Sequence, residues 1–439
     1  MIGIGTLMLL LPWAHNGGVG FLEALFTSTS AVCVTGLIVV DTGSEYTVFG
    51  QIVILLLIQT GGIGVMSFAG LVFQLFGRRM SLRAQAALSN SMLQREVADE
   101  FKGVFVRILY FVLIAEIIGA VLLFIAMFPR KGVSHAAYSA VFHSISAFCN
   151  AGFSIYSDSM TGWRGNHVVV SVVMLLIILG GIGHPVAVDI QRRIMNRKND
   201  KNVKNKTLLR LSLTSKVVLY TSGVLIVSGM LLLLFFGLTP GESSLWEKIS
   251  GSLFQSVTAR TAGFNTVDIG KLPLTSIFLL VIWMFIGGSP GSCAGGIKTT
   301  TFTLWLAKLP CLLRGEKSPR LFDRHIPGEV MRRVSMIIGL ALLWNLAGVL
   351  LLLVTETAGA GASAGAGGPG MHDVLFEQVS AFGTVGLSTG LTPQLSTAGR
   401  VWIIATMFVG RLGPLTIASW AFTRKRPGIR YPEGRIMIG

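Results

Sequence analysis

The chain has 439 residues, of which 52% are hydrophobic and 13% are charged, and its mean hydropathy is +0.69. Soluble domains carry about 25% charged residues, so this composition excludes an ordinary soluble protein and indicates an integral membrane protein. The apolar runs are continuous and do not alternate with period two, which predicts spanning helices and not a barrel. We therefore expect an all-α integral membrane fold.

The formal net charge of +16 would suit a nucleic-acid partner, but the placement of the charges excludes one. Four segments, 78–107, 192–216, 308–333 and 424–435, hold 27 of the 36 lysines and arginines. They alternate with stretches poor in basic residues, as the positive-inside rule requires of cytoplasmic loops. We expect these loops to face anionic lipid headgroups. The predicted cytoplasmic segments are 78–103, 196–211, 314–330 and 425–439.

The first quarter of the chain, residues 1–77, contains a half-helix, a turn and one long apolar run. The half-helix Gly20–Val32 is too short to cross a bilayer, which takes about 20 apolar residues. The turn 33–37 follows, and then the span Phe49–Phe76. Only Ile2–Pro12 precedes the half-helix, so we expect the first helix to be truncated and the given start to be internal. The alternative is a first helix that is this short.

The other three quarters repeat the order of span, half-helix, turn and span. Residues 104–195 give Val104–Phe128, His135–Phe148, 149–153 and a span from His167 to about Asp189. Residues 212–313 give Leu213–Leu238, Leu245–Arg260, 261–265 and Thr275–Ile286 with a continuation. Residues 331–424 give Val334–Val354, Asp373–Phe382, 383–388 and Thr397–Phe422. The Gly/Ala-rich stretch 358–370 reads as an outer loop.

Each of the four turns carries one glycine in an apolar setting, and these glycines lie 116, 111 and 123 residues apart. A near-constant period indicates an internal fourfold repeat. Four such turns around one axis would form rings of backbone carbonyls that replace the hydration shell of an ion. The alternative is a kink in an ordinary span, which four periodic copies disfavour. The predicted ion ligands are the carbonyls of Val34, Thr35, Gly36, Asn150, Ala151, Gly152, Thr261, Ala262, Gly263, Thr384, Val385 and Gly386.

Acidic residues follow three of the turns by five or six positions: Asp41, Asp158 and Asp268. At an outer pore mouth they would concentrate cations, and the negative C-terminal ends of the half-helices would face the ion. The alternative is that they are solvated loop acids or helix caps. The fourth quarter has Leu391 or Thr392 at this place.

A small-residue break is expected in each second span, 24–28 residues after the turn glycine. The breaks are 61–64, 180–183, 287–290 and 410–413. The third continues to residue 296 and has five glycines among ten residues, so it cannot continue a helix. We expect it to form a gate below the turns, the alternative being a passive hinge. The predicted gate residues are Gly287, Gly288, Ser289, Gly291, Gly295, Gly296, Lys298 and Arg411.

Two charged residues lie inside predicted spans. Arg411 takes the place of a glycine in the fourth break, and a charge at membrane depth is costly and usually functional. We expect it to repel ions or to hold the gate through its carbonyls, the alternative being a side chain that reaches the inner interface. For Glu116 a lysine partner, a buried packing role and an ion role remain open. His184 reads as structural.

The motifs of soluble enzymes are missing from the sequence. It has no phosphate-binding loop, no dinucleotide fingerprint after a strand, no His-Glu-x-x-His and no Cys-x-x-Cys, so we expect neither an enzyme nor a zinc site. The opposing transporter class is a secondary active cation symporter that works by alternating access. Such proteins more often show two repeats than four.

The four turns, the stretch Gly288–Thr299 and the run Gly410–Pro414 together resemble the Trk/Ktr/HKT superfamily of potassium transporters, most closely the bacterial Ktr membrane subunit (KtrB-like). The resemblance implies a pseudo-fourfold pore in a multi-pass protein of the bacterial cell membrane. Gly36 stands where sodium-selective plant relatives have serine, which implies potassium. The family's gate loop maps onto Gly287–Gly296 and its pore arginine onto Arg411.

The resemblance also implies partners. The chain would pair as a homodimer on a cytoplasmic ring of RCK-type nucleotide-binding subunits (KtrA-like), and ATP or ADP would bind to that ring. It implies sodium-dependent uptake, with no cofactor bound by this chain itself. We therefore expect a gated, selective pore for potassium.

Overall fold

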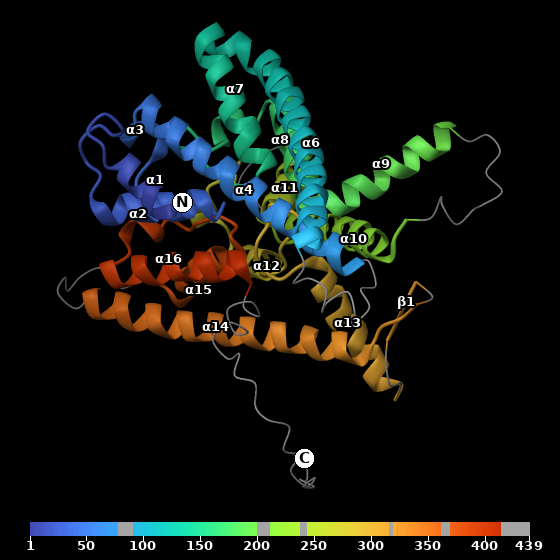
Figure 1. Cartoon of the computed structure of the whole chain (residues 1–439). Coiled ribbons are helices and arrows are strands. Elements are labelled where there is room, and N and C mark those ends of the chain that lie inside the picture. The colour runs from blue at the N-terminus through green and yellow to red at the C-terminus, as the bar shows by residue number, and fades with distance from the viewer. Residues whose placement is uncertain are drawn as a thin grey trace.

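The computed structural model describes residues 1–77, 91–199, 211–237, 244–315, 319–322, 324–360 and 369–413. This part of the chain is almost entirely helical (Figure 1). Its only strands are β1 (Arg320–Leu321) and β2 (Arg324–His325), which pair antiparallel. The expected all-helical fold is confirmed. The predicted segments 78–103, 196–211, 314–330 and 425–439 lie wholly or partly outside the described residues.

The helices follow the predicted order in each quarter. The first quarter has α1 (Ile2–Leu9), α2 (Phe21–Val32), α3 (Thr42–Glu45) and α4 (Val48–Gly77). The second has α6 (Ser91–Lys131), α7 (Val133–Phe148), η2 (Thr161–Trp163), α8 (His167–Ile182) and α9 (His184–Asn199). The third has α10 (Leu213–Phe236), α11 (Leu245–Thr258), η4 (Ile269–Lys271), α12 (Leu274–Phe285) and α13 (Thr299–Leu313). The fourth has α14 (Gly328–Ala360), α15 (Met371–Gly383), η5 (Thr392–Gln394) and α16 (Thr397–Leu412).

Three described helices contain segments long and apolar enough to cross a membrane. They are Phe105–Lys131, Leu213–Phe236 and Gly328–Glu356. The pair His167–Ile182 and His184–Gln191 passes the same test together but is bent by 96°. The predicted span from His167 to about Asp189 is therefore broken at Gly183, inside the break expected at 180–183. Gly183 has φ +87°, a conformation that glycine adopts without strain, and it turns the chain sideways there.

The four helices that precede the turns are short. α2, α7, α11 and α15 have 12, 16, 14 and 13 residues. At 1.5 Å per residue they span about 18–24 Å, less than the roughly 30 Å of a hydrocarbon core. Most of their C-terminal residues are buried, so each half-helix ends inside the protein.

The quarters pack in a closed order. The second span of each quarter contacts the half-helix of the next: α4 contacts α7, α8 contacts α11, and α12 contacts α15. The fourth contact, α16 with α2, brings the end of the chain back to its beginning. In Figure 1 the red α16 lies beside the blue α2. The half-helices therefore form a ring.

The predicted break at Gly61–Gly64 is wrong, because α4 continues through it. The glycine serves close packing instead, since a Cβ on Gly61 would lie 2.1 Å from the Val32 carbonyl oxygen. Gly180 meets Phe148 O and Gly410 meets Phe382 O in the same way. A small residue is thus needed where the second span crosses the end of its own half-helix. The start of the predicted loop 358–370 is also helical, since α14 extends to Ala360.

A candidate ion site at the ring of four turns

The backbone of the four turns has the same unusual conformation in every quarter. The residue two before the glycine has positive φ: 56° at Val34, 59° at Asn150, 78° at Thr261 and 50° at Thr384. The glycines Gly36, Gly152, Gly263 and Gly386 follow with φ of 88°, 71°, 80° and 93°. The middle residues Thr35, Ala151, Ala262 and Val385 are not in this region. Non-glycine residues adopt positive φ at a cost, so all four quarters hold the same strained backbone conformation at this place.

The turns touch one another in a closed circle. A Cβ on Gly36 would lie 2.3 Å from Ala151 O, and one on Gly152 would lie 2.8 Å from Ala262 O. For Gly263 the neighbour is Val385 O at 2.4 Å. The circle closes where a Cβ on Gly386 would lie 2.2 Å from Thr35 O. The structure therefore brings together all twelve predicted ligand residues, and no turn glycine has room for a side chain.

A hydroxyl residue before each turn braces it, and sequence reasoning missed this group. Ser146, Thr258 and Ser380 donate to the carbonyls of Phe153, Phe264 and Leu387 at 2.6–2.7 Å. Ser30 Oγ and Ser380 Oγ accept from the amides of Gly36 and Gly386 at 3.1 and 3.2 Å. All four are fully buried. The detectable signal is a Ser-Ala or Thr-Ala pair five or six residues before each glycine.

A cavity of about 430 Å³ opens on the glycine side of the ring. All four turn glycines line it, together with Asp158 and Asp268. Asp41 does not, because its carboxylate accepts from Ser44 Oγ and Ser157 Oγ and caps α3. Asp268 pairs with Lys271 at 2.9 Å, and this hydrogen bond and charge attraction raise the pKa of Lys271. Two of the three predicted acids thus line this cavity, which we call the vestibule.

The fourth quarter has a carboxylate of a different origin, Glu377 on α15. It is fully buried and accepts from Ser388 Oγ at 2.5 Å, from Thr389 N at 3.0 Å, and from Thr392 Oγ1. It therefore fixes the loop that follows the fourth turn. Sequence reasoning missed it because the helix carries it nine residues before the glycine, not after it.

The stretch 286–298, which we call the intramembrane loop, has no helix and lies on the other side of the ring. A Cβ on Gly295 would lie 2.2 Å from Thr384 Oγ1, so the loop packs against the fourth turn. A backbone bridge joins the ends of the loop, with Gly287 N donating to Ile297 O at 2.8 Å. All of the predicted gate residues are buried except Lys298, which is half-buried.

The loop is tied to the second and fourth quarters. Ser289 N donates to Gly181 O at 3.1 Å, and His184 N donates to Gly291 O at 3.0 Å. On the other flank Gly296 N donates to Gly410 O at 3.3 Å. The backbone of His184 thus supports the loop at the bend between α8 and α9.

Arg411 joins the loop to the first quarter. Its Nη1 donates to the Cys293 carbonyl of the loop, and its Nη2 donates to Gly61 O at 3.0 Å. Both acceptors are neutral, and the side chain does not reach out to the interface. Lys298 donates to Ala294 O within the loop. One of the two acceptors of Arg411, the Cys293 carbonyl, belongs to the loop, and the other belongs to α4.

Glu116 has a neutral partner. Gln59 Nε2 donates to its Oε2 at 2.9 Å, and Cys149 Sγ lies 3.9 Å from its Oε1. The side chain is 5% exposed and links α4, α6 and the end of α7. Of the alternatives left open, the buried packing role fits these contacts.

Residues 1–425 match the TrkH family, described as a cation transport protein. The chain belongs to this family. It is 37% identical to the Ktr system potassium uptake protein B of Bacillus subtilis (strain 168), over 99% of this chain and 94% of that protein. It is 33% identical to the potassium/sodium uptake protein NtpJ of Enterococcus hirae, over 100% of this chain and 95% of that one.

The fold has a solved counterpart. The crystal structure of the potassium transporter TrkH from Vibrio parahaemolyticus superposes with a TM-score of 0.72 at 18% identity, covering 96% of this chain and 82% of that one. The chain described here is therefore a multi-pass membrane protein of the TrkH family, and it is a transporter and not an enzyme. The resemblance stated from the sequence is confirmed.

Proposed function

We propose that this protein takes up potassium across the cell membrane through a selective pore at the ring of four turns. The observation that carries the proposal is the closed circle in which each turn glycine meets the middle carbonyl of the next turn. Carbonyl rings are the usual means of replacing the hydration shell of potassium. The names of the Bacillus and Enterococcus relatives support this ion.

In the proposed path a cation enters the 430 Å³ vestibule, where Asp158 and Asp268 raise its local concentration. It then passes the carbonyls of the four turns. The half-helices end at these turns, so their partial negative charges add to the attraction. This passage needs no covalent step and no proton transfer. The energy of the ion depends only on how well the carbonyls replace its water and on the charges around it.

The intramembrane loop acts as the gate below the ring in this proposal. The loop lies against Thr384. Arg411 links it to α4 by donating one hydrogen bond to the loop and one to α4. Movement of the loop would break a small number of hydrogen bonds, because its other ties to quarters two and four are a few backbone contacts. Opening of the gate then depends on breaking those contacts and on moving the positive charge of Arg411 away from the path.

The chain functions in this proposal as the ion-conducting subunit of a Ktr-type system. It would pair as a homodimer on an RCK-type cytoplasmic ring that binds ATP or ADP. The word "system" in the Bacillus relative's name supports a second component. Sodium is proposed as an activator, which the potassium/sodium name of NtpJ supports.

The test is potassium uptake in a potassium-transport-deficient bacterium that expresses the chain with a Ktr-type regulatory partner. We expect growth at low external potassium and uptake that saturates without a fixed sodium-to-potassium ratio. Uptake with an obligatory stoichiometric sodium flux would instead favour the alternating-access symporter. A failure to transport potassium under both sodium-rich and sodium-free conditions would refute the proposal.

A further inference from the structure

In the ring, the fourth quarter lies beside the first, although the chain does not run directly from one to the other. Quarters one to two, two to three, and three to four follow one another in sequence, but the contact between α16 and α2 joins residues more than 350 positions apart. Side-chain and packing contacts alone must close the ring at this place, which we call the seam.

An ion pair lies across the seam. Arg400 Nη1 on α16 donates to Glu23 Oε1 on α2 at 2.7 Å. The two side chains are 20% and 24% exposed, so water screens them only in part. Two other ion pairs of the described residues, Lys271 with Asp268 and His372 with Asp373, join close neighbours in sequence.

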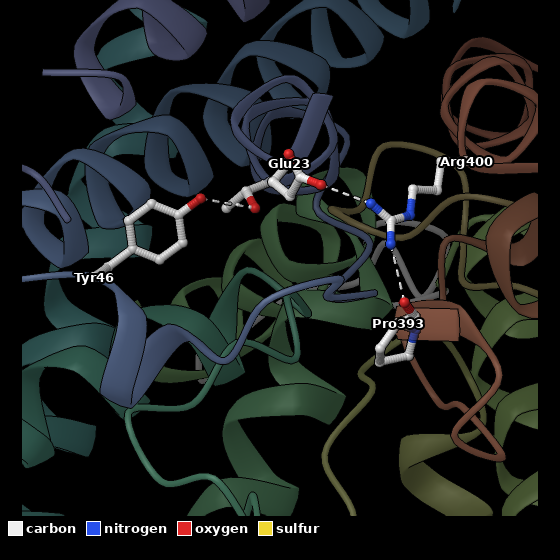
Figure 2. Close-up of polar contacts among 5 residues, drawn as sticks. Glu23, Tyr46, Pro393 and Arg400 are labelled. Atoms are coloured by element: carbon white, nitrogen blue, oxygen red, sulfur yellow. Dashed lines mark hydrogen bonds and ion pairs between the residues drawn. The ribbon is translucent and has the colours of Figure 1, made fainter. Parts of the chain in front are cut away.

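The second branch of the same guanidinium reaches the pore mouth. Arg400 Nη2 donates to Pro393 O at 3.0 Å, and Pro393 lines the vestibule. Figure 2 shows Arg400 between Glu23 and Pro393, with one dashed contact to each. A planar guanidinium holds two such acceptors in a fixed relation, which an ammonium group does not.

Glu23 fixes the first half-helix at its start. It lies in the first turn of α2, where the helix dipole favours a carboxylate. One turn further along, Thr27 Oγ1 accepts from Tyr46 OH at 3.1 Å (Figure 2). α2 is therefore held on one side by its own quarter and on the other by Arg400.

The other quarters lack this pair at the corresponding positions. Arg400 stands 14 residues after its turn glycine, and Glu23 stands 13 residues before its own. The residues 14 after the other glycines are Gly50, Asn166 and Ile277, and those 13 before are Ser139, Ser250 and Asp373. The pair is thus a feature of the seam and not of the repeat.

We propose that Glu23 and Arg400 are positioning residues that close the ring and thereby set the spacing of the fourth and first turns. Arg400 joins the first half-helix to the loop behind the fourth turn, whose glycine meets Thr35 O. Loss of the pair lets this side of the ring widen. This inference rests on the proposed function, because its readout is ion affinity and selectivity.

The experiment compares Glu23→Gln, Arg400→Gln and the charge-swapped pair E23R/R400E in the full transport system. The readouts are the potassium concentration for half-maximal uptake and inhibition by sodium. We expect each single variant to raise that concentration roughly three- to tenfold, because it leaves one partner of a partly exposed ion pair without its opposite charge. The swapped pair should recover only part of that loss, because opposite charges again face each other but the bond to Pro393 O is not restored.

The direction of the two single variants separates positioning from a simple field effect. Removing a negative charge and removing a positive charge near the mouth would shift cation affinity in opposite directions if only the field mattered. Positioning predicts the same direction for both. Opposite directions, or wild-type values in both at normal protein amounts, would overturn the proposal.

Two controls keep the result interpretable. Arg107→Gln removes an exposed arginine that donates to Gly103 O of its own helix, and uptake should stay unchanged. If Arg400→Gln does not accumulate, Arg400→Lys keeps the charge but loses the two-branched contact, and the same shift is expected in smaller degree. A wild-type chain that takes up no potassium would refute the proposed function itself.

Discussion

At the scale of single residues, the four hydroxyl side chains before the turns explain how a strained backbone persists. Ser146, Thr258 and Ser380 each bind a carbonyl just beyond the turn, and Ser30 binds the amide of Gly36. Positive φ at a non-glycine residue costs of order 1–3 kcal/mol, so it persists only where surrounding contacts such as these hold the backbone in place. These hydroxyl residues therefore support the candidate ion site although they do not line the cavity beside it.

Ser380→Ala tests this role, because Ser380 makes two bonds, to Leu387 O and from Gly386 N. Both partners are near the ring, and each lost bond costs about 1 kcal/mol. We expect weaker potassium affinity and stronger competition by sodium at normal protein levels. Ser228→Ala is the matched control, since Ser228 bonds the preceding turn of its own exposed helix face. Equal effects of the two variants would contradict the brace.

The sequence predicts some of these residues and not others for a physical reason. A position with positive φ that tolerates no Cβ selects glycine, so the four glycines can be recognised from the sequence alone. The partners of Glu377 and Glu116 come from loops and helices 11 to 57 residues away. Sequence period carries no information about such contacts, so both roles required the structure.

At the scale of elements, short apolar runs predicted the four half-helices to within two residues at either end. Length alone distinguishes them from spans. The glycine-rich runs were harder to interpret, because glycine serves either a helix end or close packing. Gly61 packs against Val32 within a continuous helix, while Gly183 has positive φ and bends the chain.

Arg411→Gln tests the intramembrane loop as a gate. The arginine contributes two hydrogen bonds that hold the loop to α4 and a positive charge in the path. We expect maximal potassium uptake to rise several-fold with little change in half-saturating concentration. Arg107→Gln again serves as the control. Slower uptake with a normal amount of protein would show that the loop does not obstruct the path.

Gly183→Ala tests the support of the loop by the α8–α9 bend. A Cβ there would lie 2.8 Å from Pro290 O, and φ is +87°. We expect a lower unfolding temperature and altered maximal uptake, because strain at the bend shifts the loop. Gly339→Ala within α14 meets nothing within 4 Å and should be neutral or stabilising. Wild-type behaviour of Gly183→Ala would contradict this coupling.

At the scale of the whole molecule, the near-constant spacing of the turn glycines indicated four equivalent units. It could not show their order in space. The order comes from packing, in which each second span covers the next half-helix and α16 returns to α2. Equivalence is also incomplete. The loop 286–298 exists in the third quarter alone among the described residues, and the Glu23–Arg400 pair exists only at the seam.

The most direct test of the ring as a selective ion site is Gly36→Ser, compared with Gly17→Ser. Both glycines have positive φ, but a Cβ at Gly17 meets nothing within 4 Å, while one at Gly36 would lie 2.3 Å from Ala151 O. We predict that Gly36→Ser raises the half-saturating potassium concentration at least tenfold and admits more sodium, while Gly17→Ser transports normally. Unchanged potassium affinity and selectivity in Gly36→Ser would contradict the account.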